Sequence, residues 1–437
     1  MDGATRRHFR MYDFGAPAPV RPSARLRWRN RGLASVRPTV WFLGLTSLLT
    51  DVSSEMVTSV LPLYVVLHLG MTPLALGALD GLYQSAAAVV RTLSALVADR
   101  LGRHKTVAVV GYGASAIAKL GYLAAGTAWP ALIGVIVADR LGKGIRTAPR
   151  DALIAQHSAP SQLATAFGVH RAMDAAGAAL GPLAAFAILW LVPGRFDQVF
   201  LMSFAVALAG VAALLLLVDA PAAPDGPQPA TRVSGSAAVR AVATQEFGGI
   251  AGAAWVLSAA SVSDALLYLM LQRELAFDPA WLPLLYVGTP LCYFAMAGPL
   301  GMLADRTSTS GTFIAGHACL LLVYALLALA PAGPLLLVVA LLLLGAYYAA
   351  TDGVLAAMAS AALPAHVRAT GLSVLATGTT LARAGAAVAF GALWTYRGPD
   401  LALSVFSVAL LCAIVAGGVL LTRAGQSRPF DNARGPT

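Results

Sequence analysis

Twelve long apolar runs dominate this sequence and limit what the chain can fold into. Their approximate bounds are 39–66, 74–97, 106–126, 130–152, 162–191, 197–218, 247–271, 281–303, 311–330, 334–361, 369–395 and 399–421. Each run is long enough to cross a hydrocarbon layer roughly 30 Å thick as a helix. Only helices and closed barrels can cross such a layer, because every backbone polar group must be bonded internally. We therefore expect an all-α membrane protein with twelve transmembrane helices.

The balance of residue types excludes a soluble globular domain. Hydrophobic residues make up 58% of the chain and charged residues only 11%, whereas soluble domains carry roughly 25% charged residues. The net charge of +10 would suit a nucleic-acid partner, but nine of the 30 Lys and Arg residues precede the first apolar run. That placement is typical of a cytoplasmic tail beside a bilayer, so we expect no nucleic-acid partner.

The charged loops indicate how the chain crosses the membrane. An even number of helices places both termini on one side, and the loops of that side hold most of the remaining cations. These are Arg100, Arg103, Lys105, Arg150, Arg232, Arg240, Arg306, Arg368, Arg423, Arg428 and Arg434, against Arg195, Arg273 and Arg397 on the other side. The positive-inside rule then predicts a protein of the inner (plasma) membrane with both termini in the cytoplasm.

Composition also divides the chain into segments. A stretch rich in Pro, Ala, Ser and Gly separates the first six apolar runs from the last six. We expect a basic cytoplasmic tail, an N-terminal six-helix bundle, a cytoplasmic linker, a C-terminal six-helix bundle and a second tail. Their bounds are 1–38, 39–218, 219–246, 247–421 and 422–437.

The two halves resemble each other. "LVADRLGRHK" follows the second apolar run of the first half, and "GMLADRTSTS" follows the second run of the second half. Two six-helix halves in parallel repeat are typical of a transporter whose binding site lies between them near the bilayer midplane.

These loop motifs resemble the signature G-x-x-x-D-R-x-G-R-R/K of the major facilitator superfamily, and the resemblance covers residues 38–421. The first copy matches at Asp99, Arg100, Gly102, Arg103 and Lys105, with Ala95 where glycine is usual, and the second copy keeps Gly301, Asp305 and Arg306. The resemblance implies that both loops act as a gate at the inner ends of the helices.

Two further patterns of this family occur in part. The fourth-helix pattern R-x-x-Q-G is matched by Arg140 and Gly144, with Lys143 in place of Gln. The fifth-helix pattern G-x-x-x-G-P-x-x-G-G, typical of exporting antiporters, is matched by Gly177, Gly181 and Pro182, while Ala184 and Ala185 replace the closing glycines. The resemblance therefore implies proton-coupled export.

Two acids in the first apolar run are candidates for a proton site. Asp51 and Glu55 lie one helical turn apart near the middle of the span. A charged group at that depth costs at least about 2.5 kcal/mol, so it usually lines a water-filled path or has a partner. Two close carboxylates tend to share a proton. The alternative is a structural role, in a hydrogen-bonded cluster with Ser53 and Ser54 or in salt bridges to the fourth helix.

Other intramembrane charges extend this candidate path. They are Asp80, Arg140, Lys143, Arg146, His170 and Asp174. His170 has a titration range that suits proton transfer. Asp80 could instead be hydrated near the headgroups, and Asp174 could form a fixed pair with Arg171. The second half is poorer in charge, so we expect it to supply a mostly apolar wall.

The leading hypothesis is a secondary active transporter, a proton-coupled antiporter that exports a drug or metabolite by alternating access. Asp51 and Glu55 would bind the proton beside Arg140. The alternatives are a proton-coupled importer of an anion drawn to Arg140, Lys143 and Arg146, a divalent-metal exporter with Asp51, Glu55 and His170 as ligands, and a receptor or scaffold without transport. We expect a monomer in the bilayer with a small-molecule substrate, no cofactor, no resident metal and no enzymatic activity.

Overall fold

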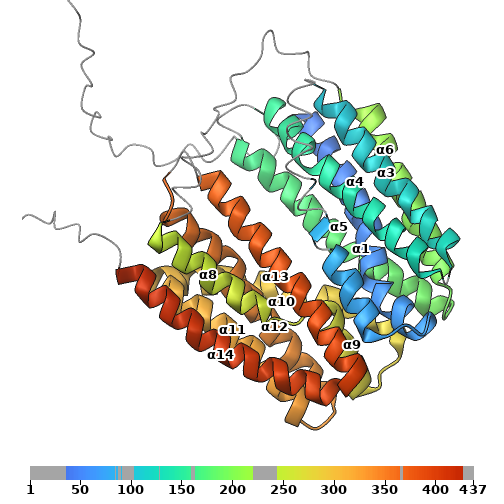
Figure 1. Ribbon diagram of the computed structural model, residues 1–437. Coiled ribbons are helices and arrows are strands. Elements are labelled where there is room, and N and C mark those ends of the chain that lie inside the picture. The colour runs from blue at the N-terminus through green and yellow to red at the C-terminus, as the bar shows by residue number, and fades with distance from the viewer. Residues whose placement is uncertain are drawn as a thin grey trace, which may run out of the picture.

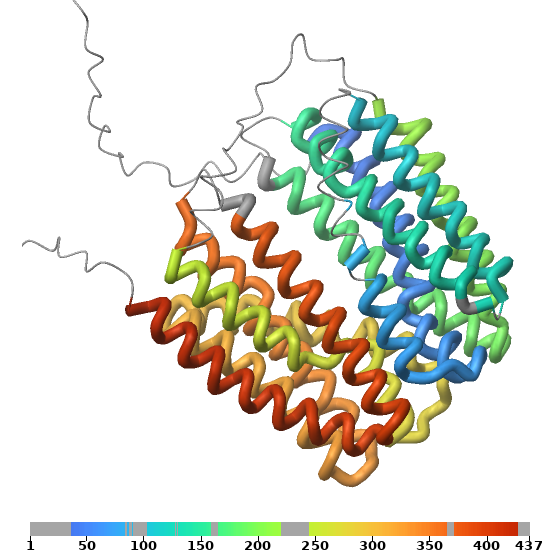
Figure 2. The backbone as a smooth tube through the Cα atoms, viewed as in Figure 1, coloured from blue at the N-terminus to red at the C-terminus, as the bar shows by residue number. Residues whose placement is uncertain are grey.

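The computed structural model describes residues 36–83, 85, 86, 90, 103–126, 128–158, 163–219, 244–364 and 368–426. Nearly all of these residues are helical, and none of them lies in a strand. The helices form two bundles that lie side by side (Figure 1). Figure 2 shows that the blue-to-green half of the chain makes one bundle and the yellow-to-red half makes the other. The two-bundle, all-α fold expected from the sequence is confirmed.

The first bundle is built around α1, which packs against α5 and α6, while α3 packs against α4 and α6. Its helices are α1 (Pro38–Pro62), the π-helical turn η2 (Leu63–His68), the helical segment 73–83, α3 (His104–Ala125), α4 (Trp129–Gln156), α5 (Leu163–Leu191) and α6 (Phe196–Leu217).

In the second bundle α12 packs against α10 and α11, and α14 packs against α8 and α11. Its helices are α8 (Gln245–Ala259), α9 (Asp264–Leu275), the 3-10 turn η4 (Pro279–Trp281), α10 (Leu282–Arg306), α11 (Thr309–Leu329), α12 (Pro334–Ala361), α13 (Arg368–Arg397) and α14 (Pro399–Gln426).

The outer surface of the bundles is apolar. Within the described ranges, nine helical stretches are long and apolar enough to cross a membrane. Leucines point outward from them, and Leu216 and Leu329 are 82% and 84% exposed. Because exposed leucine is costly in water and not in hydrocarbon, this surface fits a bilayer. Two long helices are outside that set, α1 and α4, and both carry the charged residues of the candidate path.

The seventh apolar run differs from the sequence expectation, because it is a broken helix. Helix α8 ends at Ala259 and α9 begins at Asp264. Tyr324 of α11 bonds the backbone freed by the break: its hydroxyl accepts from the Val262 N–H (2.7 Å) and donates to the Ala260 carbonyl (3.3 Å). Irregular backbone at membrane depth is tolerated where protein satisfies it in this way.

The two bundles contact each other at one end. There the Leu74 N–H at the start of segment 73–83 donates to Thr395 Oγ1 near the end of α13 (2.9 Å). The rings of Trp190 in α5 and Trp281 in η4 meet edge to face at 5.9 Å. We call these contacts the seam. They lie beside the connections that follow the first, fifth, seventh and eleventh apolar runs, which all fall on the same side of the molecule.

Candidate functional site

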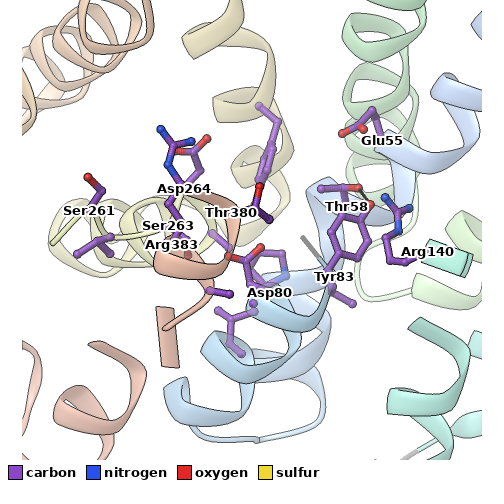
Figure 3. Close-up of a pocket in the computed structure, with 18 of the residues that line it drawn as sticks. Glu55, Thr58, Asp80, Tyr83, Arg140, Ser261, Ser263, Asp264, Thr380 and Arg383 are labelled. Atoms are coloured by element: carbon purple, nitrogen blue, oxygen red, sulfur yellow. Dashed lines mark hydrogen bonds between the residues drawn. The ribbon is translucent and has the colours of Figure 1, made fainter. Parts of the chain in front are cut away.

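A cavity of about 390 Å³ lies between the two bundles. Figure 3 shows Glu55, Tyr83 and Arg140 on one side of it and Asp264 and Arg383 on the other. Its polar lining comes from both halves: Glu55, Thr58, Asp80, Tyr83, Arg140, Lys143, Ser261, Ser263, Asp264, Tyr286, Tyr347, Tyr348, Thr380 and Arg383. We call this space the central cavity.

Close packing of α3 against α4 creates a buried charge cluster behind the cavity. A Cβ atom on Gly142 would lie only 2.7 Å from the Ser115 nitrogen, so glycine permits the approach. Asp139 accepts from Lys119 Nζ (2.9 Å) and from Arg140 (2.8 Å), and the Ser115 hydroxyl also donates to it. The side chains of Asp139 and Lys119 are fully buried. One carboxylate therefore serves two cations without water.

Arg140 is held from two sides. Asp139 binds one edge of its guanidinium group, and the Tyr83 ring stacks 3.6 Å from the guanidinium carbon. The Tyr83 hydroxyl is in turn hydrogen-bonded to Thr58. The Arg140 Nε atom is buried with no hydrogen-bond partner within the described structure. Cation–π stacking and a charge-assisted bond fix the position of this positive charge at the cavity wall.

Glu55 and Lys143 are the cavity groups with the fewest direct partners. Neither makes an ion pair within 4.0 Å or a hydrogen bond to another residue that the structure describes. Both side chains are only partly buried and both border the cavity. Their charges are thus available to a ligand or a proton.

Two glycines of α5 set the position of the acids in α1. A Cβ atom on Gly177 would lie 2.5 Å from the Leu48 carbonyl oxygen, and one on Gly181 would lie 2.9 Å from the Glu55 Cβ. The glycines therefore bring the two backbones into contact at the turn that carries Asp51 and Glu55. Pro182 is buried in the same stretch of α5.

The other half of the predicted path forms a separate cluster. Asp51 lies 3.5 Å from Arg146, while Asp174 lies 3.9 Å from Arg150 and 3.4 Å from His170. The structure thus pairs Asp51 with a cation of α4, as the structural alternative expected, and gives it no hydrogen bond to Glu55. Asp174 meets Arg150 and His170, whereas the neighbouring Arg171 is exposed.

The expected apolar wall of the second half is wrong. Asp264 accepts from the Tyr348 hydroxyl (2.7 Å), and Arg383 donates to the Tyr347 hydroxyl (3.0 Å), both at the cavity. The break between α8 and α9 exposes Ser261 and Ser263 there as well. The sequence "SVSDALL" held a signal for this, because a serine before an acid and an apolar stretch is typical of a helix start.

The predicted gate loops are only partly described. Asp99, Arg100 and Gly102 lie outside the described residues. Arg103 precedes α3, and Lys105 donates to the Leu215 carbonyl at the end of α6 (3.1 Å). Gly301, Asp305 and Arg306 lie in the last turns of α10, where both charged side chains are exposed. No three His, Cys, Asp or Glu side chains gather as metal ligands in the described part of the chain.

Comparisons with known proteins agree with this architecture. The family model of the Major Facilitator Superfamily matches residues 43–387. An uncharacterised MFS-type transporter of Methanocaldococcus jannaschii is 28% identical over 407 residues, which cover 91% of this chain and 97% of that protein. An uncharacterised protein of Mycobacterium tuberculosis is 31% identical over 180 residues, 41% of this chain and 42% of its own.

Solved structures share the fold at low identity. The nucleoside transporter NupG superposes with a TM-score of 0.73 at 15% identity, over 88% of this chain and 99% of its own. A POT family transporter in complex with 5-aminolevulinic acid gives 0.73 at 13% identity, over 89% and 96%. Because the family model spans most of the sequence, this chain belongs to the major facilitator superfamily and is a multi-pass membrane transporter, not an enzyme.

Proposed function

We propose that this protein is a proton-coupled secondary transporter that exports a small polar molecule from the cytoplasm by alternating access. The observation that carries the proposal is Glu55, a carboxyl group on the wall of the central cavity with no ion-pair partner within the described structure. A carboxylate at membrane depth is costly to keep charged without a partner. A proton is therefore a suitable occupant whenever the substrate is absent.

The surrounding residues support separate roles for the two predicted acids. Asp51 has Arg146 as a fixed partner, so we assign it to holding α1 against α4 rather than to carrying the proton. Arg140 is fixed by Asp139 and Tyr83 and supplies a stationary positive charge to the same cavity. The proton site is thus Glu55 alone, with Arg140 and Lys143 setting the electrostatic potential around it.

The direction of transport rests on two observations. The charge distribution of the loops favours cytoplasmic termini, which places the seam at the outer face of the membrane. A structure held together at that face offers its cavity to the cytoplasm, where an exported substrate enters. The glycines of the exporter-type pattern in α5 support the same direction, because they form the contact that positions Glu55.

Inside-out membrane vesicles test the proposal. Vesicles that contain the full chain are acidified internally, and a panel of drugs and metabolites is added while a pH-sensitive dye reports the lumen. We expect an exported compound to be taken up and to release protons from the lumen, and Glu55→Gln to abolish that release. Asp197→Asn, in the exposed loop pair with Arg195, is the matched control and should behave as the unmodified protein. Uptake that leaves the proton gradient unchanged would exclude coupling, and uptake only in right-side-out vesicles would indicate an importer.

A further inference from the structure

A second cavity of about 440 Å³ adjoins the central one, between α5 and α10. The two cavities share Asp264, Tyr286 and Tyr348 in their walls. On the α5 side the second cavity is bordered by the small side chains of Ala175, Ala178 and Ala179. A molecule in the central cavity can therefore extend past these shared residues into the second space.

The second cavity is suited to an apolar group. Its outer edge is formed by Leu291 and Phe294 of α10, which are 67% and 60% exposed on the lipid-facing surface. The Tyr268 hydroxyl that borders it is already used, because it donates to Thr289 (2.8 Å). Alanine and aromatic surfaces gain from burying hydrocarbon. The acid that this cavity adds is Asp352, an exposed side chain of α12.

The central cavity, in contrast, presents both signs of charge without pairing them. Three acids and three cations line it: Glu55, Asp80, Asp264, Arg140, Lys143 and Arg383. No ion pair within 4.0 Å joins any two of these six.

In the second bundle, tyrosine hydroxyls take the place of an ion pair. Tyr348 bonds the Asp264 carboxylate and Tyr347 bonds the Arg383 guanidinium group. The acid and the cation are thus positioned in one wall while each keeps binding capacity for a ligand. A ligand that matches this wall carries a positive and a negative group a few atoms apart.

From this geometry we infer that the substrate is a small zwitterion with an apolar side group. Its ammonium group binds Asp264, its carboxylate binds Arg383 and faces Lys143 across the cavity, and its side group occupies the second cavity. The inference takes the central cavity as the substrate site, as the proposed function does, but it does not depend on the direction of transport or on the coupling ion.

Physical cost separates this class from the alternatives. A ligand with a single charge leaves either Asp264 or Arg383 without a partner at membrane depth, where an unpaired charge is expensive. An uncharged polar ligand leaves both without one. A zwitterion satisfies both groups with charge-assisted hydrogen bonds and adds no net charge to the membrane interior.

A set of probes with matched side groups tests the inference by ligand-dependent thermal stabilisation of the purified full-length protein. The zwitterions are leucine, phenylalanine and tryptophan. Each is compared with its amine, which lacks the carboxylate, and with its acid, which lacks the ammonium group. We expect at least one zwitterion to bind, and its amine and acid to bind at least about tenfold more weakly, since each loses a bond to a charged group. Equal binding of a single-charge analogue, or no binding by any of the three zwitterions, would overturn the inference.

Variants locate the two parts of the ligand. Asp264→Asn should weaken the zwitterion at least about tenfold and reduce its advantage over the corresponding acid. Ala178→Phe fills the second cavity and should weaken tryptophan and phenylalanine while binding of glycine is unchanged. Ala176→Phe is the matched control, because Ala176 is exposed on the same helix. Similar effects of the two phenylalanine substitutions would refute the second cavity as the side-group site, and Ala178→Leu repeats the comparison if the larger variant does not fold.

The readouts distinguish this inference from the proposed function. Binding to the purified protein needs no proton gradient, so a zwitterion could bind and yet move without protons or in the other direction. In that case the proposed coupling or direction fails and the substrate class stands. If instead protons are coupled to a compound with a single charge, the substrate class fails and the coupling stands.

Discussion

Asp139→Asn is the substitution with the largest stability effect that the structure predicts. It removes the negative charge that two cations share, Lys119 at 2.9 Å and Arg140 at 2.8 Å, in a cluster whose side chains are at most 3% exposed. Breaking a buried pair by neutralising one partner costs about 3–5 kcal/mol, because the other charge stays buried without compensation. Since two charges lose their partner here, we expect a loss in the upper part of that range, about 4–5 kcal/mol.

The measurement is reversible unfolding of the purified protein in mixed micelles, followed by tryptophan fluorescence as the fraction of denaturing detergent rises. Asp197→Asn is the control, because the Arg195–Asp197 pair is 54% and 51% exposed and should change stability by about 0–1 kcal/mol. The double variant Lys119→Met with Asp139→Asn removes one of the two stranded charges and should recover part of the loss. Equal stability of Asp139→Asn and Asp197→Asn would refute the view that one carboxylate holds both cations.

Three further changes test other contacts. Gly181→Leu should separate α5 from α1 at Glu55 and reduce transport at least about tenfold, whereas transport at the normal rate would show that the contact is not needed. Tyr324→Phe should cost about 1–3 kcal/mol in the same unfolding assay, since the backbone at the helix break loses its partner, and unchanged stability would contradict this account of the break. Leu74→Cys with Thr395→Cys, in a background without the native cysteines, should form a disulfide on oxidation that stops transport until it is reduced, and full transport by the oxidised protein would show that the seam does not open.

Much of the fold follows from the length and number of the apolar runs, because a bilayer allows few structures besides helices. The small-residue pattern of Gly177 and Gly181 also indicated a close helix contact, which the structure places against α1. Spacing along one helix correctly put Asp51 and Glu55 one turn apart.

The partners of the buried charges could not be predicted in the same way. Spacing shows which residues share a face of one helix, but not which face meets another helix. Glycines at the crossing of α3 and α4 bring Lys119 beside Asp139, and this contact depends on packing between two segments. The broken seventh helix had the opposite cause, since its apolar residues continue through the break and Tyr324, more than 60 positions away, supplies the bonds.

The central claim is that Glu55 carries the proton in a cavity shared by both bundles. Proteoliposomes allow one direct comparison, in which Glu55→Gln is measured for substrate counterflow at equal pH and for substrate movement driven by a pH gradient. The account predicts that counterflow continues, because the cavity still binds substrate and still alternates, while the gradient-driven movement is lost. Gradient-driven movement at the rate of the unmodified protein would contradict the claim.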